Sequence, residues 1–181
     1  MNPVSLVIVV LEDDRQRMFI YRFLKARGFG PHQLRIEGSP AGRGSAEAWV
    51  REALVREMRV YRSRQARTGL IVAIDADNYT VGERLHQLDE ALKNNGMPTV
   101  AEDERIARLV PKRNIETWIL CLNGLDVDET TDYKSSRNDW NDLTRNAAAT
   151  LSEWNRGNIP VPASCIDSLR TGLKELERIR P

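Results

Sequence analysis

Residues 70–78 have the sequence LIVAIDADN, a short apolar run that ends in two acids separated by one alanine. The run is rich in β-branched residues, which is typical of a strand buried on both faces in the middle of a parallel sheet. Because side chains alternate along a strand, Asp75 and Asp77 are expected to point to the same side. They lie at the carboxyl end of the strand, where open α/β sheets bind their ligands.

The acidic pair has two explanations. Two neighbouring carboxylates repel each other unless a proton or a cation lies between them, so the pair is a candidate ligand site. The structural explanation is that one acid caps the following helix and the other is solvated. The pair alone leaves both explanations open, and the rest of the chain has to decide between them.

The order of the predicted elements indicates the fold class. Strands are expected at residues 4–11, 33–36, 69–74 and 106–110, and helices between them at 12–27, 45–66 and 80–95. Helices of ten or more residues between strands favour right-handed crossovers and a mostly parallel sheet covered by helices on both faces. We therefore predict an α/β protein with a three-layer, Rossmann-like arrangement.

The last third of the chain has a different character. A further helix is expected at 114–122, after which the pattern divides the chain into an α/β core of residues 1–122 and a C-terminal part of residues 123–181. The C-terminal part begins with an acidic loop and continues with two helical patterns, at 137–155 and 163–179. Their apolar stripes need a surface to pack on, so we expect a helical annex against the core. The heptad-like spacing of the last helix is also compatible with a homodimer seam.

The composition excludes several classes of protein. The chain has 181 residues, of which 41% are hydrophobic and 29% are charged, as in ordinary globular proteins. No apolar run approaches the roughly 20 residues needed to span a bilayer, and the apolar start lacks the basic region of a signal peptide. Cys121 and Cys165 have neither metal-ligand spacing nor a disulfide framework. We expect a cytoplasmic protein with no membrane partner.

The charges are unevenly distributed, although the net charge is only +1. Seven arginines but only three glutamates lie between Arg43 and Arg67, while acids cluster at 12–14, 75–77 and 126–132. This separation is compatible with a basic surface that binds a polyanion beside an acidic pocket. The alternative is a solvated amphipathic helix with surface arginines.

Three basic residues are candidate phosphate ligands. Arg43 lies in the glycine-rich loop 42–45 before a helix, where backbone N–H groups could also face a phosphate. Lys112 and Arg113 follow the fourth strand and would lie beside the acidic pocket. The structural alternatives are an ordinary loop and a surface pair, and both stay open.

Carboxylates follow three of the predicted strands. Glu12 comes directly after the first strand, Asp75 and Asp77 end the third, and Glu116 lies in the first turn of the helix after the fourth. If the first and third strands are neighbours, Glu12 and the aspartate pair meet at the same edge of the sheet. Carboxylate oxygens are the ligands of Mg²⁺ and Mn²⁺, which stabilise charge in phosphoryl transfer. Glu12 would also serve as a general acid or base if its neighbours raise its pKa.

Glu12 after the first strand and Asp75-Ala76-Asp77 after the third resemble the two signatures of the Toprim domain. Topoisomerases, bacterial primases, recombination-repair proteins and nucleases of the overcoming-lysogenisation-defect type share this domain. The resemblance covers residues 4–122. It implies a Mg²⁺- or Mn²⁺-dependent site for cleavage or transfer of phosphodiesters in DNA or RNA. It also implies Glu12 as acid, base or ligand, Asp75 and Asp77 as metal ligands, and Glu116 as an auxiliary acid.

Residues 111–118, with the sequence PKRNIETW, are similar to a segment of small bacterial Toprim-like proteins. Some of those proteins are associated with phage defence or mobile elements. Larger Toprim nucleases commonly work with a motor domain, so the resemblance implies a separately encoded ATPase or another defence-system protein as partner. The chain departs from the family at Asp13, where a glycine usually allows a tight turn.

Two other functions remain open beside a nuclease-type enzyme. The first is a non-catalytic Toprim-like binding or assembly subunit, which the Asp13 departure and the small size favour. The second is a receiver-like phospho-acceptor domain, because receiver domains place an acidic pair after the first strand and an acceptor aspartate after the third. A receiver also needs a lysine after a fifth strand, and the sequence has no clear fifth strand.

Overall fold

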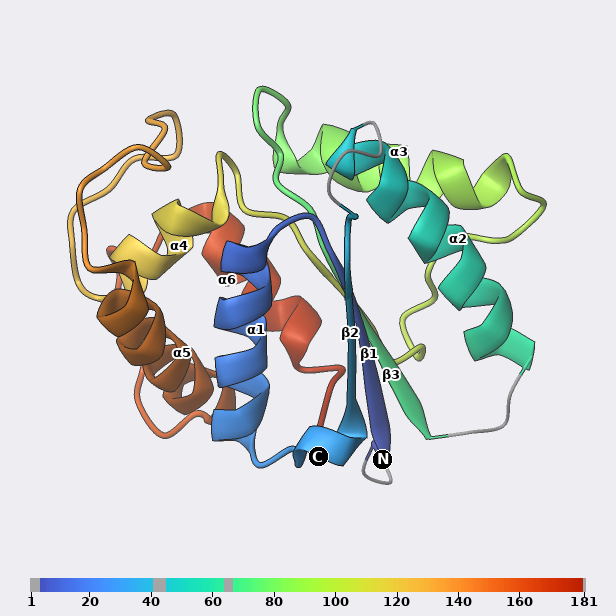
Figure 1. The fold of residues 1–181 in the computed structure, drawn as a ribbon, viewed down its shortest axis with the longest axis horizontal. Coiled ribbons are helices and arrows are strands. Elements are labelled where there is room, and N and C mark those ends of the chain that lie inside the picture. Colours follow the sequence, from blue (N-terminus) through green and yellow to red (C-terminus); the bar gives the residue numbers. More distant parts are fainter. Residues whose placement is uncertain (1–3, 41–44, 64–66, 181) are drawn as a thin grey trace.

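The computed structural model describes residues 4–40, 45–63 and 67–180, which form four strands and six α-helices (Figure 1). In chain order they are β1 (Leu6–Leu11), α1 (Asp14–Arg27), β2 (Leu34–Gly38), α2 (Ala46–Ser63), β3 (Thr68–Ala73), α3 (Val81–Lys93), β4 (Ile106–Leu109), α4 (Ile115–Leu122), α5 (Trp140–Arg156) and α6 (Asp167–Leu176). A short 3₁₀ turn, Pro31–Gln33, precedes β2.

The four strands form one sheet in the order β2-β1-β3-β4, and all neighbouring strands are parallel. The register aligns Val9 with Ile71 and Ala73 with Leu109. The predicted α/β class with a Rossmann-like parallel sheet is therefore confirmed. β1 and β3 are neighbours in this sheet, which meets the condition stated above for Glu12 and the aspartate pair and places the ends of the two strands side by side.

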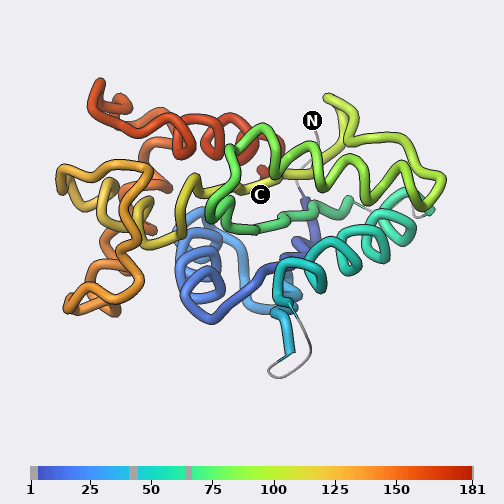
Figure 2. Tube along the Cα trace, turned by 90° about the horizontal axis from the view of Figure 1, so that it is seen from above, coloured from blue at the N-terminus to red at the C-terminus, as the bar shows by residue number. Residues whose placement is uncertain are grey.

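Helices cover both faces of the sheet (Figures 1 and 2). One buried cluster joins Val7, Val9 and Leu11 of β1 to side chains of α1, α4, α5 and α6. The other joins Ile8 and Val10 to side chains of α2 and α3. The two sets of β1 residues alternate because successive side chains of a strand point to opposite faces. Because helices cover both faces, side chains on either face of the central strands are buried, and these strands contain almost no polar residues.

The two C-terminal helices, α5 and α6, pack into the hydrophobic core on one face of the sheet. α5 packs along α1 and α4, and α6 lies beside β4. The indole N–H of Trp118 on α4 donates a 2.7 Å hydrogen bond to the hydroxyl of Ser168 on α6. Gly172, one turn further along α6, leaves room for the Trp118 ring, since a Cβ at this position would overlap it. Near the chain ends, the N–H of Val4 donates to the carbonyl of Arg180 at 3.0 Å.

The helix ends agree with the sequence signals in most places. Asp13 caps α1 by accepting a hydrogen bond from the N–H of Gln16, and Gly28 ends it in the left-handed conformation. α5 begins later than predicted because Asp139 caps it, accepting hydrogen bonds from the N–H groups of the next turn. α6 also begins late, because the chain first turns through a hydrogen bond from the N–H of Cys165 to the carbonyl of Pro162.

No helix within the described ranges is long and apolar enough to cross a lipid bilayer. The buried positions of the longer helices form stripes on one face, as in helices that cover a sheet.

Candidate carboxylate site

Glu12 and Asp75 meet at the carboxyl edge of the sheet, as their positions after β1 and β3 predict. The backbone N–H of Asp75 donates a 2.8 Å hydrogen bond to Oε2 of Glu12. The bond links two residues that lie immediately beyond two adjacent parallel strands. The site therefore follows directly from the strand order.

Gln16, on the first turns of α1, connects the two carboxylates. Its Nε2 donates to Oδ1 of Asp75 at 2.9 Å and lies 3.4 Å from Oε2 of Glu12. Its Oε1 accepts a hydrogen bond from the N–H of Glu12 at 2.9 Å. Because the Gln16 side chain is fully buried, this amide fixes the orientation of both acids.

Asp75 is only 1% exposed, and its Oδ2 has no hydrogen-bond partner in the part of the chain that the structure describes. Burial, reinforced by the negative charge of Glu12, raises the pKa of Asp75 well above its usual range. The closest cation to Oδ2 is the ammonium of Lys134, at 3.4 Å. A contact of this length is an ion pair without a well-aligned hydrogen bond. Asp75 therefore retains an unsatisfied oxygen.

Asp77 is arranged differently from Asp75. β3 ends at Ala73, and Asp77 adopts a left-handed backbone conformation with φ 53°, so strand alternation does not control its direction. Its side chain is 49% exposed and lies 3.9 Å from Nη2 of Arg84. Burial raises the pKa of Glu12, and the negative charge of Asp77 adds to this rise.

Glu116 lies in the first turn of α4 and is buried. Its Oε1 pairs with Nε of Arg15 at 3.1 Å, and its Oε2 has no hydrogen-bond partner among residues 4–40, 45–63 and 67–180. Burial raises the pKa of Glu116. Arg15 also lies over the ring of Trp140, 4.5 Å from its centre. Glu116 is thus a buried acid paired with Arg15, and its negative charge acts on Lys134.

Lys134 reaches the site from the irregular segment between α4 and α5, a position that the sequence allowed but did not require. Partial burial disfavours its charged form, but the charges of Asp75, Asp77 and Glu116 raise the pKa of Lys134. Asp132 anchors the segment, since its Oδ1 accepts hydrogen bonds from Nδ2 of Asn114 and from the N–H of Lys134, each at 2.9 Å. No periodicity or motif marks such a residue in the sequence.

The candidate phosphate ligands have different positions. Nζ of Lys112 donates to the carbonyl of Tyr79 at 2.9 Å, and Nη1 of Arg113 donates to Oδ1 of Asn78 at 2.6 Å. Both cations therefore lie against the turn that follows Asp77. Arg43 lies outside the residues that the structure describes.

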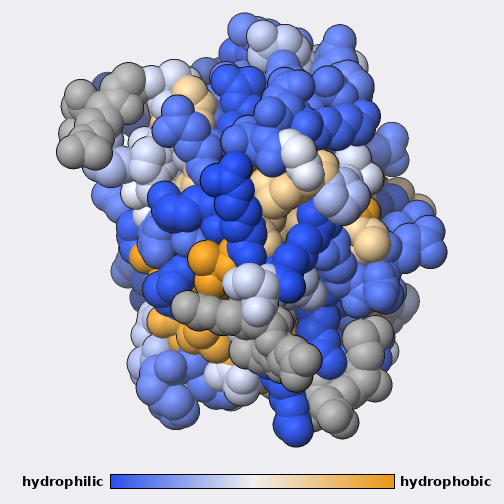
Figure 3. All heavy atoms as spheres, turned by 90° about the vertical axis from the view of Figure 1, so that its right-hand side faces the viewer, coloured by the Kyte–Doolittle hydropathy of each residue, from blue (hydrophilic) through white to orange (hydrophobic). Residues whose placement is uncertain are grey.

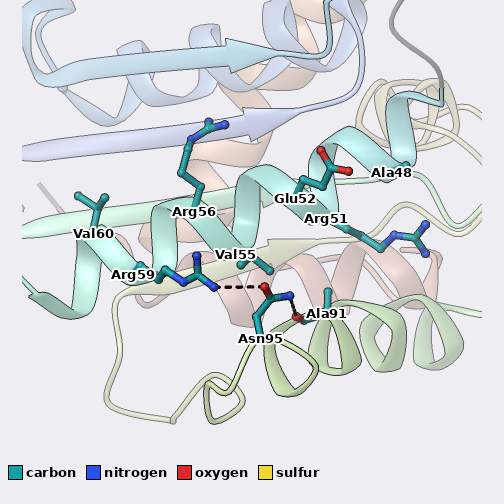
Figure 4. A pocket seen from close by; sticks show the side chains of 9 residues that line it. All are labelled: Ala48, Arg51, Glu52, Val55, Arg56, Arg59, Val60, Ala91 and Asn95. Carbon is teal, nitrogen blue, oxygen red and sulfur yellow. Dashed lines mark hydrogen bonds between the residues drawn. The ribbon is translucent and has the colours of Figure 1, made fainter.

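The arginines of α2 lie on a separate face, which is largely hydrophilic (Figure 3). A groove of about 570 Å³ runs between α2 and α3, where Arg59 points across to Asn95 and Arg56 points away (Figure 4). Most of these arginines pair with acids: Arg51 with Glu47 at 3.1 Å, Arg56 with Glu37 at 2.6 Å and Arg62 with Glu104 at 2.7 Å. This pairing favours the solvated amphipathic helix over a free basic surface.

The carboxylate oxygens of the site are of the chemical type that binds a hard divalent cation. Their present positions do not form a complete set of metal ligands. Carboxylate oxygens suit Mg²⁺ and Mn²⁺, and Asp75 supplies a buried oxygen without a hydrogen-bond partner. Within the described ranges, however, no group of three or more His, Cys, Asp or Glu side chains is arranged to hold a metal. Coordination by Asp75 requires Lys134 to leave its Oδ2.

We compared the chain with protein-family models, curated proteins and solved structures, and none of them matched. The Toprim resemblance therefore depends on the sequence motifs, and the function has to be argued from the site.

Proposed function

We propose that this protein is a Toprim-like enzyme that uses Mg²⁺ or Mn²⁺ to cleave or transfer phosphodiester bonds in DNA or RNA. One observation carries the proposal: Glu12 and Asp75, from adjacent strands, are held together, and Asp75 keeps a buried oxygen without a hydrogen-bond partner. Burying two like charges side by side is costly unless a proton or a cation compensates them. A divalent cation supplies that compensation, and such cations bind phosphates.

The residues divide into ligands and proton-transfer groups. Asp75 and Asp77 would hold the metal, with the half-exposed Asp77 on the solvent side. Glu12 would be either a third ligand or the proton-transfer group. A bound metal would stabilise negative charge on the oxygens of the phosphoryl group. The raised pKa of Glu12 suits it to exchange a proton with the attacking or leaving oxygen. Glu116, whose pKa is also raised, is an auxiliary acid.

Lys112 and Arg113 would contact the phosphates that flank the reacting bond. Both lie at the turn after Asp77. Lys112 uses one donor there, and Arg113 uses one for Asn78 and lies 3.8 Å from Oδ2 of Asp132 through another. A guanidinium carries five N–H donors and an ammonium three, so both retain donors for a phosphate. The substrate of this proposal is a nucleic acid, and a separately encoded ATPase or another phage-defence protein is its proposed partner.

A nuclease assay tests this function. Wild-type protein is incubated with DNA and with RNA in Mg²⁺, in Mn²⁺ or in a chelator. We expect metal-dependent cleavage that falls at least a hundredfold in Glu12→Gln and in Asp75→Asn. Asp103→Asn is the matched control, because Asp103 is an exposed acid before β4, at the opposite edge of the sheet. Cleavage that survives in Asp75→Asn would reject the proposal.

One observation favours the non-catalytic assembly subunit. Gln16 and Lys134 already contact both oxygens of Asp75 without a metal, so the acids have a structural role available. This alternative predicts a stable complex with a partner protein that is unaffected by Asp75→Asn. Co-purification of wild type and variant with the same partner would support it.

The receiver-like alternative is favoured by Lys134. A lysine close to the acceptor aspartate is what that function requires, and Lys134 lies 3.4 Å from Asp75 although no fifth strand exists in the described ranges. Incubation with acetyl phosphate and Mg²⁺ separates the two chemistries. A phosphoryl group on Asp75 or Asp77, detected by mass spectrometry, would support the receiver, and its absence together with nuclease activity would support the enzyme.

A further inference from the structure

Arg84, near the start of α3, is a fully buried arginine behind the carboxylate site. Burial of a guanidinium is costly unless ion pairs and hydrogen bonds compensate it. Nη1 of Arg84 pairs with Oε1 of Glu47 on α2 at 2.5 Å and donates to Oε1 of Gln87 at 2.7 Å. These two contacts hold one side of the guanidinium between α2 and α3.

The other side of the Arg84 guanidinium faces the turn between β3 and α3. Nη2 lies 3.4 Å from the carbonyl oxygen of Ala76 and 3.9 Å from Oδ2 of Asp77. The guanidinium also lies over the ring of Tyr79, 4.8 Å from its centre. One planar group therefore contacts the backbone, the acid and the aromatic ring of a single turn.

That turn contains an unusual backbone conformation. Asp77 is the one residue other than glycine with a positive φ in the part of the chain that the structure describes. For an L-residue with a side chain, the left-handed backbone conformation costs about 1 kcal/mol or more, although aspartate tolerates this conformation better than most residues. Such conformations persist where the surroundings impose them, and they are common at functional sites. The surroundings here include Arg84 and the hydrogen bond from the N–H of Tyr79 to the carbonyl of Ala76, at 2.9 Å, together with the contacts of Lys112 and Arg113 described above.

We propose that Arg84 is the positioning residue of the carboxylate site, holding the β3–α3 turn and with it the direction of the Asp77 carboxylate. This inference rests on the proposed function, because positioning Asp77 matters only if the site binds a metal. The contacts of Arg84 themselves do not depend on a metal.

Lysine cannot replace arginine in this role. The contacts on both sides of Arg84 need a planar group with separate donors, whereas an ammonium is a single point of charge on a flexible stem. Arg84→Lys therefore keeps the charge and removes the bridge between α2, α3 and the turn. A matched control is Arg108→Lys, because Arg108 also bridges two acids, Asp89 at 2.9 Å and Glu175 at 3.6 Å, away from the site.

The first test is amide hydrogen exchange, followed by NMR, at Tyr79, whose N–H closes the turn. We expect the Tyr79 amide to exchange at least tenfold faster in Arg84→Lys than in wild type, after correction for any loss of global stability in the variant. Arg108→Lys should leave this exchange unchanged after the same correction. Unchanged exchange in Arg84→Lys, or equal acceleration in both variants, would overturn the inference.

The second test is the affinity for Mn²⁺, measured by electron paramagnetic resonance well below the unfolding temperature. Loss of groups that orient metal ligands typically weakens binding about 10- to 100-fold, and we expect this for Arg84→Lys but not for Arg108→Lys. Wild-type affinity in Arg84→Lys would overturn the inference. If the wild-type protein itself binds no Mn²⁺, the proposed function fails, and the exchange measurement at Tyr79 alone decides whether Arg84 positions the turn.

Discussion

The backbone N–H of Asp75 donates a hydrogen bond to Oε2 of Glu12 over 2.8 Å, and this bond joins the residues that follow β1 and β3. It brings a second carboxylate next to a buried one. Burial raises the pKa of both groups, and the negative charge of Glu12 raises that of Asp75 further, whereas the hydrogen bond itself lowers the pKa of Glu12. A protein that needed only stability would not gather these charges. The pair therefore has measurable consequences for stability, for metal binding and for activity.

Asp75→Asn should stabilise the protein at neutral and alkaline pH. The pKa of Asp75 is raised in the folded state, so between its ordinary value and this raised value the folded state binds more protons than the unfolded state. Stability therefore falls as the pH rises through that window, and the penalty is fully present above the raised pKa. Removing the charge should raise the melting temperature at pH 8 by about 2 to 4 °C, the shift that 1 kcal/mol gives in a domain of this size.

Thermal unfolding of wild type and Asp75→Asn at pH 5 and pH 8, without divalent metal, checks this sign. The advantage of the variant should be larger at pH 8. A variant that is less stable than wild type at both pH values, by the same amount, would show that the charge of Asp75 carries no penalty.

Lys134→Met should destabilise the protein at neutral pH, because Asp75 loses its nearest cation. Lys134 is 45% exposed, so solvent screens the pair and we expect a loss of about 1 kcal/mol. Saturating Mg²⁺ should restore most of that stability in the variant, since the metal would take the place of the ammonium. Thermal unfolding with and without Mg²⁺ measures both effects, and an equal effect of Mg²⁺ on wild type and variant would contradict the exchange of Lys134 for metal.

Gly172→Ala tests how the C-terminal helices are held. A Cβ at this position would overlap the ring of Trp118, so α4 and α6 must move apart, at a cost of about 1–3 kcal/mol. Gly82→Ala is the control, because Gly82 is exposed on α3 and its Cβ would meet only the Thr80 hydroxyl, at 4.0 Å. Chemical denaturation should show the first variant destabilised and the second equal to wild type or slightly more stable. Equal stability of both variants would mean that α6 does not pack as described.

Arg113→Ala should weaken substrate binding more than the chemical step. Arg113 lies beside the site at Asn78 and is proposed to contact a flanking phosphate, which is bound equally in the ground state and the transition state. We expect KM for a DNA substrate to rise about tenfold while kcat changes less than threefold. A large fall in kcat at constant KM would place Arg113 in the reaction itself.

The sequence predicted the strands, their parallel arrangement and the meeting of Glu12 with Asp75, because these depend on apolar runs and on strand ends. It did not predict the direction of Asp77, since the chain leaves the strand at Ala73 and turns. It also missed Arg84, which occupies an ordinary position in an amphipathic helix. Its burial becomes apparent only when Glu47 and the turn are placed around it.

The contact of Lys134 with Asp75 could not be predicted from the sequence either, because Lys134 lies in an irregular segment. Its role depends on Asp132 and Asn114, which fold the segment back toward β3. Contacts between residues far apart in the chain leave no periodic signal in a single sequence. Charge composition left the role of the α2 arginines open for a related reason, because two of them, Arg56 and Arg62, pair with acids from other elements.

Calorimetric titration of the wild-type protein with Mn²⁺ tests the central claim most directly, with Asp75→Asn and Asp103→Asn measured in parallel. The carboxylate site predicts one saturable binding event in wild type and in Asp103→Asn, weakened at least tenfold in Asp75→Asn. No binding by the wild type, or equal binding by all three proteins, would contradict a metal site at the ends of β1 and β3.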